Sequence, residues 1–225
     1  ELGGHAPVIV YEDTDADSIA EQAAVVKFKH CGQVCASPSR FFVHENLAER
    51  FTEKFVNVTK KFQLGDGMEH GIDIGPLATK KRLEEVELMV KKTLEAGARL
   101  RLGGKRPENI KNGFFYEPTV LDQVPDDSPV MKEEPFGPIV PITTFKNFND
   151  VIERANSLEY GLTSYIFTSS QKLAHLTADS IEAGMVAINT FALASAETPY
   201  GGIKQSGFGR EGGSQGIHDY LNIKY

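Results

Sequence analysis

The sequence predicts an α/β fold, an open and mostly parallel twisted sheet with helices on both faces. The first part of the chain alternates short β-branched or aromatic runs with amphipathic segments, the pattern of parallel strands joined by crossover helices. Its 225 residues, 40% of them hydrophobic and 24% charged, are enough for one large domain with a buried core. This composition excludes a disordered tail and a collagen-like repeat, and the two cysteines exclude a disulfide scaffold.

The first strands and helices follow from short-range patterns. Residues 7–11 form an apolar run short enough for a buried strand. Residues 13–31 begin with acidic side chains and continue with apolar residues at helical spacing, and Gly32 is available as the helix stop. A second strand is predicted over residues 40–43. Amphipathic helices are predicted over residues 47–62 and 83–97, with a Gly-rich loop between them over residues 65–76.

The second half of the chain continues the alternation and then loses it. Further strands are predicted over residues 99–102, 114–120, 139–145, 163–168 and 185–189, and helices over residues 149–157 and 170–181. Periodicity disappears over residues 190–213, where Gly and Ser dominate, and a long irregular segment of this kind is usually functional. Residues 220–225 predict a solitary strand at the end of the chain.

Composition and charge exclude several classes of partner. The formal net charge is −7 and no block of basic residues gathers locally, which argues against an electrostatic grip on nucleic acid. No apolar run approaches the roughly 18 to 20 residues of a membrane-spanning helix, and the first residues lack the pattern of a signal peptide. We therefore expect a cytoplasmic protein without nucleic-acid or membrane partners. Because the chain begins without Met, we also expect a fragment of a longer protein.

The strongest local feature is Gly32-Gln33-Val34-Cys35, where a glycine ends a helix and the cysteine falls in the turn before a strand. A thiol at that position can face a cleft, and uncommitted backbone N–H groups can stabilise a thiolate and an oxyanion beside it. Such a turn is expected to lower the pKa of Cys35 and would suit a nucleophile, but a lone cysteine is more often a small buried hydrophobe, so the residues alone leave both interpretations open. Cys31 is interpreted as structural.

Two other chemistries of cysteine find less support. A zinc site needs about four Cys or His ligands, and His30, Cys31 and Cys35 have no second cluster to complete them. We therefore expect no metal. A cysteine protease needs a distant histidine as base, and nothing in the sequence selects one.

Two further motifs differ in what they predict. Residues 133–138, Glu-Glu-Pro-Phe-Gly-Pro, combine two carboxylates, an aromatic ring and turn residues, and they predict either a ligand-facing turn or a plain packed turn. Residues 207–212 match the pattern G-x-G-x-x-G, but no buried strand precedes them and no acidic ribose partner can follow. They are therefore not a Rossmann fingerprint.

Four motifs, in this order, resemble those of the aldehyde dehydrogenase superfamily. They are Glu1-Leu-Gly-Gly4, Gly32-Gln-Val-Cys35, Glu133-Glu-Pro-Phe-Gly-Pro138 and Pro199-Tyr-Gly-Gly-Ile-Lys-Gln-Ser-Gly-Phe-Gly-Arg-Glu211, and they span nearly all of the chain. The resemblance implies the catalytic half of an NAD(P)-dependent oxidoreductase that converts an aldehyde to an acid through a cysteine thiohemiacetal and thioester. It also implies a homo-oligomer.

The same resemblance implies roles for individual residues. Cys35 looks like the nucleophile, and Glu1 looks like the general base that activates water to release the acid. Glu134 resembles the carboxylate that binds the nicotinamide ribose, with the ring of Phe136 beside it. Leu2 is a further expected contact with the NAD or NADP cofactor.

Within the superfamily, the stretches around Cys35, over residues 201–207 and over residues 219–225 look most like succinate-semialdehyde and related semialdehyde dehydrogenases. Those enzymes need a cation to hold the remote carboxylate of the substrate. Lys29 lies where that subgroup often has Arg, and it keeps the charge without the bidentate fork. By the same resemblance, Ser195 supplies a hydroxyl to this carboxylate, and Asn189 belongs to the substrate site.

The resemblance also divides the chain. Residues 1–213 are expected to form the catalytic domain, and residues 214–225 an oligomerisation segment whose last strand pairs with a neighbouring subunit. The dinucleotide-binding domain of the family precedes its Glu-Leu-Gly-Gly motif, so we expect that domain to be absent from this chain and the chain alone to be inactive. A non-catalytic assembly domain and a thiol esterase or acyltransferase are the alternatives. Cys35 and Glu1 argue against the assembly domain, which would not require them, and Glu134 with Phe136 favours a nicotinamide partner over the esterase or acyltransferase.

Overall fold

The computed structural model describes residues 1–225. Its main sheet contains β1 (Ala6–Val10), β2 (Pro38–His44), β3 (Arg99–Leu102), β4 (Thr119–Asp122), β5 (Ile139–Phe145), β7 (Thr163–Phe167) and β8 (Met185–Ile188). These strands lie in the order β3-β4-β5-β2-β1-β7-β8, and only β3 is antiparallel to its neighbour. A separate antiparallel pair joins β6 (Tyr160–Gly161) to β9 (Ile203–Lys204).

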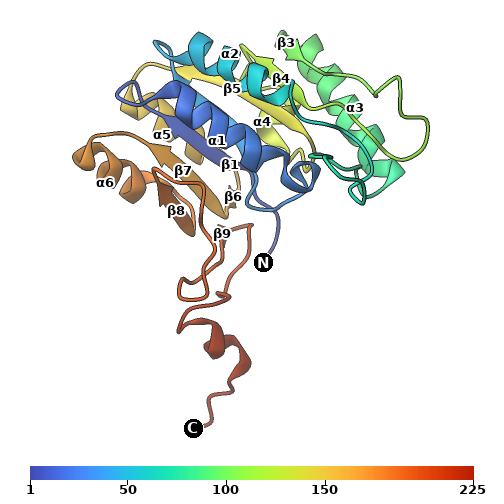
Figure 1. Ribbon diagram of the computed structural model, residues 1–225. Coiled ribbons are helices and arrows are strands. Elements are labelled where there is room, and N and C mark those ends of the chain that lie inside the picture. The colour runs from blue at the N-terminus through green and yellow to red at the C-terminus, as the bar shows by residue number, and fades with distance from the viewer.

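Helices cover both faces of the sheet (Figure 1). They are α1 (Ala16–Phe28), α2 (Ala48–Thr59), α3 (Lys80–Glu95), α4 (Pro129–Lys132), α5 (Phe148–Asn156) and α6 (Gln171–Ser180). The helices α1 and α2 pack side by side on one face, whereas α5 and α6 lie together on the other. This arrangement confirms the predicted open, mostly parallel α/β sheet.

Most predicted elements occur within a few residues of their expected bounds. The strand predicted over residues 40–43 is β2, and the helix predicted over residues 83–97 is α3. A capping side chain explains why α3 begins at Lys80, earlier than hydrophobic spacing alone indicates. At the start of α3, the Thr79 hydroxyl accepts a hydrogen bond from the Arg82 N–H at 3.1 Å.

The end of α1 is one of two places where the prediction was wrong. The helix ends at Phe28 and not at Cys31, because His30 and Cys31 have left-handed φ angles of 50° and 59°. Gly32 continues this conformation with a φ of 73°, and a Cβ there would lie 2.2 Å from the Gly137 carbonyl oxygen. Glycine is therefore required where this loop passes the backbone that leads into β5.

The second wrong prediction is the strand expected over residues 114–120. Only its end lies in the sheet, as the start of β4. Pro118, directly before β4, has no N–H to donate to a neighbouring strand. Further upstream, the Phe114 carbonyl accepts a hydrogen bond from the Leu77 N–H at 2.9 Å. This stretch therefore pairs with a loop, although its aromatic residues gave it the composition of a strand.

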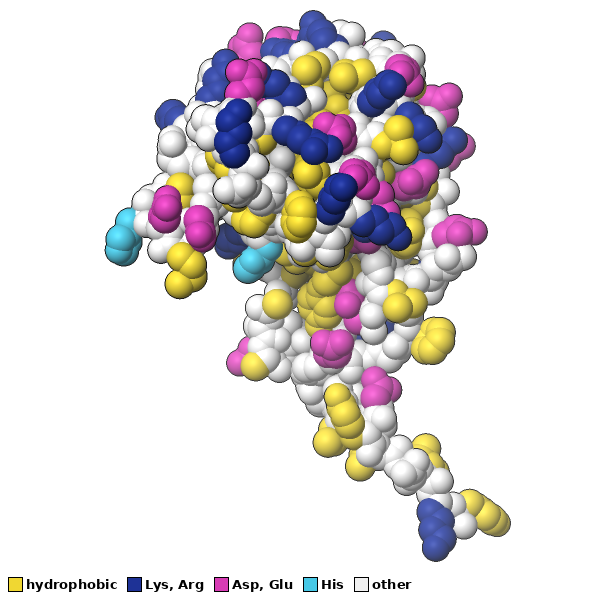
Figure 2. Space-filling view, turned by 90° about the vertical axis from the view of Figure 1, so that its right-hand side faces the viewer, with side chains coloured by type: hydrophobic (Ala, Val, Ile, Leu, Met, Phe, Trp, Pro, Cys, Tyr) yellow, Lys and Arg dark blue, Asp and Glu magenta, His cyan; other side chains and the backbone are white.

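The last part of the chain leaves the body of the molecule (Figure 1). A short 3-10 helix (Gly216–Tyr220) is followed by residues 221–225, which form no strand within this chain. Figure 2 shows hydrophobic side chains along the protruding segment, and those of Ile223 and Tyr225 are fully exposed. The pairing of residues 220–225 as a strand with a neighbouring subunit stays a prediction.

The core between α1, α2 and the sheet is rich in phenylalanine. The ring of Phe41 on β2 lies 5.6 Å from that of Phe55 and 6.1 Å from that of Phe51, both on α2. Phe28, at the end of α1, lies 6.2 Å from Phe55. All four side chains are buried, and each contributes roughly 1.5 to 3 kcal/mol to folding. This core holds the end of α1, from which the chain turns toward Cys35.

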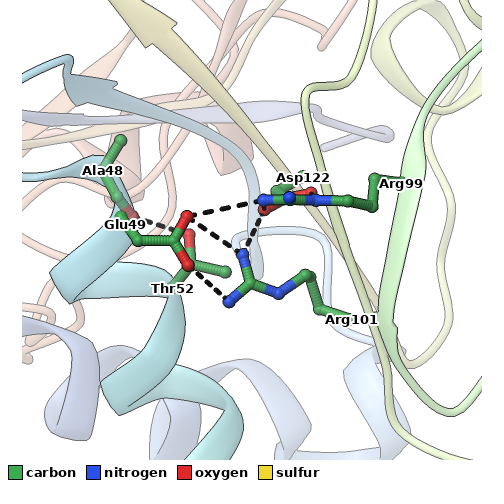
Figure 3. A network of polar contacts seen from close by, with 6 residues as sticks. All are labelled: Ala48, Glu49, Thr52, Arg99, Arg101 and Asp122. Carbon is green, nitrogen blue, oxygen red and sulfur yellow. Dashed lines mark hydrogen bonds and ion pairs between the residues drawn. The ribbon is translucent and has the colours of Figure 1, made fainter.

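An ion-pair network ties α2 to the antiparallel edge of the sheet (Figure 3). Arg99 and Arg101 on β3 both donate to the buried carboxylate of Asp122 on β4, at 2.8 Å and 2.5 Å. Arg101 also donates to Glu49 of α2 at 2.7 Å. Burial alone would raise the pKa of Asp122, but the hydrogen bonds from Arg99 and Arg101 outweigh it and hold the pKa below its ordinary value.

Candidate active site

Segments that are far apart in the sequence meet at one edge of the sheet. Residues 1–4 lead into β1, Cys35 lies just before β2, and Glu134 lies just before β5. These strands are parallel neighbours in the order β5-β2-β1, so the residues that precede them reach the same edge. We call it the amino edge, because the parallel strands begin there. Residues 199–211 reach it through Tyr200.

The thiol of Cys35 is half-buried and lies among fixed neighbours. Its Sγ is 3.3 Å from the Tyr200 hydroxyl oxygen. The carbonyl of the next residue, Ala36, accepts a hydrogen bond from the Tyr165 hydroxyl at 2.7 Å. A Cβ on Gly4 would lie 2.9 Å from the Cys35 carbonyl oxygen, so only glycine permits this approach. The position of the thiol is therefore set by contacts on both sides of its loop.

The direction of the Cys35 pKa differs from the sequence-based expectation. Burial raises the pKa of this thiol, and the Glu1 carboxylate raises it further. The hydrogen bond from Tyr200 and the backbone N–H of Ala36 both lower it, as expected of donors near a thiolate, but they do not compensate for the burial. The free N–H groups of a turn were therefore the wrong basis for predicting the net shift.

Ser206 connects the first residues to the rest of the site. Its buried hydroxyl donates to the Gly3 carbonyl at 2.8 Å and accepts from the Gly161 N–H at 3.0 Å. Its carbonyl accepts from the Leu2 N–H at 3.0 Å. The hydrogen bonds with Gly3 and Leu2 hold the segment that carries Glu1 against the motif that contains Tyr200, and the one with Gly161 joins Ser206 to β6.

The two glycines after Leu2 make room for Glu134. The Gly4 N–H donates to Glu134 Oε1 at 3.2 Å, and a Cβ on Gly3 would lie 2.8 Å from Glu134 Oε2. The carboxyl group of Glu134 is half-buried. Burial raises its pKa, with only partial compensation from the Gly4 N–H and from Arg82. The first and third motifs of the sequence thus form one unit.

A buried lysine lies beneath this unit. Lys27 is fully buried and donates to the Ser37 hydroxyl at 3.4 Å. Burial lowers the pKa of Lys27 to about 7, opposed by the nearby Cys31 thiol and the Glu134 carboxylate. Burial also raises the pKa of Cys31 to about 12. Cys31 is therefore a neutral, buried thiol at neutral pH, in agreement with the structural interpretation.

The two remaining cofactor candidates lie at different depths. Phe136 is half-buried, has a φ of 36°, and its ring centroid lies 5.9 Å from the Arg82 guanidinium. Leu2 is 62% exposed, and its side chain lies near Gly207. Phe136 thus lies on the segment of Glu134, and Leu2 lies on the segment of Glu1.

The three substrate candidates are not brought together. Lys29 is exposed and lines a hollow with Phe28 and Phe62. Ser195 is exposed in the irregular loop, where its hydroxyl lies 3.2 Å from that of Thr198. Asn189 follows β8 and therefore lies at the opposite edge of the sheet from Cys35.

The side-chain amide of Asn189 is already used within the chain. Its oxygen accepts from the Thr168 N–H at 3.0 Å, and its nitrogen donates to the Thr168 carbonyl at 2.9 Å. Both hydrogen bonds join the ends of two neighbouring strands. The geometry thus gives Asn189 a structural role and does not bring it to Cys35.

Sequence reasoning missed several residues of the site. Tyr165 and Tyr200 contact the Cys35 loop, Ser206 anchors the first residues, and Lys27 lies beneath Glu134. Tyr200 and Ser206 lie inside a motif that was recognised, but no local pattern says which of its side chains point to the thiol. A hollow of about 180 Å³, lined by Glu1, Tyr200, Arg210 and Glu211 among others, opens beside them.

Two further findings concern the whole chain. No group of three or more His, Cys, Asp and Glu side chains is arranged to hold a metal ion. None of the helices combines the length and the apolar character needed to cross a membrane.

Comparison with known proteins identifies the family. The profile described as the aldehyde dehydrogenase family matches residues 1–225. The chain belongs to this family, as its motifs indicated.

Individual relatives agree with this assignment. The chain is 43% identical over 225 residues to an Escherichia coli succinate-semialdehyde dehydrogenase named for NADP(+), of which it covers 46%. It is 42% identical to a 3-sulfolactaldehyde dehydrogenase of Pseudomonas putida, again covering 46% of it. The crystal structure of a succinate-semialdehyde dehydrogenase from Burkholderia pseudomallei matches all of this chain with a TM-score of 0.96 and 41% identity, over 46% of its own length. The chain thus spans about half the length of these relatives.

Proposed function

We propose that the protein to which this chain belongs oxidises an aldehyde to the corresponding acid, with NAD or NADP as the oxidant. The observation that carries the proposal is the meeting of Cys35, Glu1 and Glu134 at the amino edge. A nucleophilic thiol, a carboxylate beside it and a second carboxylate for a cofactor are the groups that this chemistry needs. The proposal concerns the whole protein, since this chain spans about half the length of its relatives.

The residues present fit a nicotinamide cofactor. Glu134 uses Oε1 to accept the Gly4 N–H, and its Oε2 is available to the hydroxyls of a ribose. Phe136 and Leu2 supply apolar surface on either side. When bound, the nicotinamide accepts a hydride from the substrate carbon. These residues are compatible with NAD and with NADP.

Cys35 carries out the bond-forming step. Its thiolate attacks the aldehyde carbon, a C–S bond forms, and the carbonyl π electrons move to oxygen to give a thiohemiacetal. The backbone N–H of Cys35 makes no backbone hydrogen bond and is available to this oxygen. Once the carbon has lost its hydride, the substrate is a thioester of Cys35.

Glu1 then releases the product. Its carboxylate takes a proton from a water molecule, whose oxygen attacks the thioester carbon. The C–S bond breaks, the Cys35 thiolate leaves, and the carboxylic acid is free. The position of Glu1 supports this role, because Glu1 lines the same hollow as Tyr200, whose hydroxyl lies 3.3 Å from Cys35 Sγ.

A semialdehyde with a remote carboxylate, such as succinate semialdehyde, is the substrate class that we propose. The names of two of the relatives support it. Lys29 offers an exposed ammonium group, and Ser195 offers an exposed hydroxyl, to such a carboxylate. Asn189 is left out of this proposal because Thr168 occupies its amide.

We also propose that the whole protein is a homo-oligomer. The exposed apolar side chains of Leu221, Ile223 and Tyr225 support an interface on the protruding segment, since such side chains usually become buried on association.

The test of the enzymatic proposal uses the full-length protein and a matched pair of cysteine variants. Cys35→Ala should lower the rate of NAD(P)H formation by at least about 10³-fold, because the covalent step is lost. Cys31→Ala should keep most of the rate, since that thiol is neutral and buried. Near-normal turnover by Cys35→Ala would contradict the proposal. Thiol-dependent ester hydrolysis without any NAD(P)H formation would favour a thiol esterase instead.

A further inference from the structure

A tyrosine to which the family resemblance gave no role faces the nucleophile. The hydroxyl oxygen of Tyr200 lies 3.3 Å from Cys35 Sγ. The backbone of Tyr200 is held by a reciprocal pair of hydrogen bonds with Glu211, each with an N–O distance of 2.7 Å. Main-chain contacts therefore set the position from which the phenol reaches the sulfur.

We propose that Tyr200 is a catalytic residue whose hydroxyl donates a hydrogen bond to the Cys35 thiolate and so stabilises the ionised nucleophile. Either group can donate while Cys35 is a neutral thiol. A thiolate has no proton to give, so the phenol must be the donor once Cys35 has ionised. The inference rests on the proposed role of Cys35 and adds the group that favours its reactive form.

The surroundings of Cys35 make such a donor important. Burial disfavours the ionised thiol, and the Glu1 carboxylate disfavours it further through its like charge. Two donors act in the opposite direction, the Tyr200 hydroxyl and the Ala36 N–H. Tyr165 is the other titratable side chain on this side, and its hydroxyl is directed to the Ala36 carbonyl. Tyr200 is thus the side chain that donates to the sulfur.

The phenol is suited to remain a donor. Burial raises the pKa of Tyr200, and the contact with Cys35 raises it further. Both effects favour the protonated phenol, which is the form that can donate to the thiolate. The proton stays on the phenol oxygen, and no proton transfer between the two groups is required.

The experiment measures the reactivity of Cys35 without using the dehydrogenase reaction. Full-length wild-type and Tyr200→Phe proteins react with a neutral disulfide, 2,2′-dithiodipyridine, at a series of pH values. Mass spectrometry of the peptide that contains Cys35 gives the rate of mixed-disulfide formation at this residue alone. Tyr165→Phe is the matched control, because it removes a hydroxyl that binds the Ala36 carbonyl and not the sulfur.

Loss of the hydrogen bond should produce two linked changes. The pKa of Cys35 in Tyr200→Phe should rise by about one unit, the size expected for one hydrogen bond to a charged group. The limiting rate at high pH should increase about threefold, because the more basic thiolate is the better nucleophile. Tyr165→Phe should change both quantities less.

A second variant separates the hydrogen bond from packing. Incorporation of 3-fluorotyrosine at position 200 keeps the ring and strengthens the O–H donor, so the pKa of Cys35 should fall. A packing defect in Tyr200→Phe would admit water and lower the pKa, the opposite of the expected change. An unchanged or lowered pKa in a folded Tyr200→Phe protein overturns the proposal. If Cys35→Ala keeps its dehydrogenase activity, the proposed function fails instead, while the effect of Tyr200 on the thiol is still measured.

Discussion

The polar residues at the two edges of the parallel sheet differ in how fully they are hydrogen-bonded. At the carboxyl edge, where the strands end, Asp13 follows β1 and accepts hydrogen bonds from the Thr168 hydroxyl at 2.8 Å and the Ser169 N–H at 3.0 Å, among others. At the amino edge, Cys35 and Glu134 are half-buried. The Cys35 Sγ contacts the Tyr200 hydroxyl, and Glu134 Oε1 accepts from the Gly4 N–H. The carboxyl edge is thus closed by its own hydrogen bonds, and the amino edge is not.

The pKa shifts follow from this difference. Burial alone would raise the pKa of Asp13, but hydrogen bonds from Ser169, Thr168 and Ser170 lower it. Burial also raises the pKa values of Cys35 and Glu134, and these remain raised because fewer donors face the two groups. Groups whose charged form is fully hydrogen-bonded serve structure, whereas groups that are buried with few partners are suited to chemistry.

The location of the site is also unusual for a parallel sheet. Ligands of open α/β sheets generally bind outside the carboxyl ends of the strands. In this chain the residues proposed to react, Glu1 and Cys35, and the proposed cofactor ligand Glu134 precede β1, β2 and β5, so they lie at the amino edge. The turn that contains Thr168, Ser169 and Ser170 closes the carboxyl edge around Asp13.

The largest effect is expected from removing Glu1, the proposed general base at the amino edge. In the full-length protein, Glu1→Gln should lower kcat by about 10²- to 10⁴-fold, because water activation loses its base. The Tm should change little, since Glu1 is exposed. Steady-state kinetics and thermal unfolding are the measurements. A normal kcat in Glu1→Gln would show that another group activates water.

A smaller effect at the same edge concerns the substrate. Lys29→Met should raise KM for succinate semialdehyde about 5- to 150-fold more than KM for butanal, equivalent to about 1 to 3 kcal/mol of lost charge-assisted bonding. Lys29 lies between α1 and Cys35 and is exposed, so folding should be unaffected. Equal changes for the two aldehydes would mean that Lys29 is only a solvated side chain.

A substitution at the carboxyl edge should change the stability of the protein and not its activity. Asp13→Ala removes several hydrogen bonds from an exposed turn and should cost about 1 to 2 kcal/mol, a fall in Tm of about 2 to 8 °C. Its kcat should stay near the wild-type value. A large loss of kcat in a folded Asp13→Ala protein would break the comparison between the two edges.

The contribution of Asp13 should also depend on pH. Because its folded-state pKa lies below the ordinary value of 3.8, its stabilising effect is present above pH 3.8 and is lost as the pH falls through the lowered value. The difference in Tm between wild type and Asp13→Ala should therefore shrink in acid. A difference that grows as the pH falls would contradict this assignment.

The smallest effect is expected at Glu49, the exposed carboxylate of the network between α2 and β3. Glu49→Gln should cost less than about 1 kcal/mol, because its pairs with arginine are exposed. Asp122→Asn should cost more, since the side chain of Asp122 is only 8% exposed and pairs with Arg99 and Arg101. Thermal unfolding of both variants tests this order, and equal losses would show that burial does not decide it.

Much of the fold was predictable because its signals are local. The apolar run at residues 7–11 and the helical spacing at residues 83–97 correspond to β1 and α3. The strand expected over residues 114–120 was wrong because composition does not reveal which backbone groups find a partner in the sheet. Pro118 was the local warning, since it interrupts the backbone donors.

The candidate site also has a part that could be predicted from the sequence and a part that could not. The four motifs could be recognised from residue types and their order, and they are the basis for the proposed roles of Cys35 and Glu134. The contact between Tyr200 and Cys35 could not, because 165 positions separate them and Tyr200 lies in a segment without periodicity.

The sequence by itself determined the alternation of strands and helices, the family motifs and the residue types available for chemistry. Tertiary structure alone decided the direction of the Cys35 pKa and the pairing of Asn189 with Thr168. The physical reason is that desolvation and hydrogen bonding depend on the side chains that pack around a group. At this site those side chains come from distant parts of the chain, and no local pattern records which of them will meet.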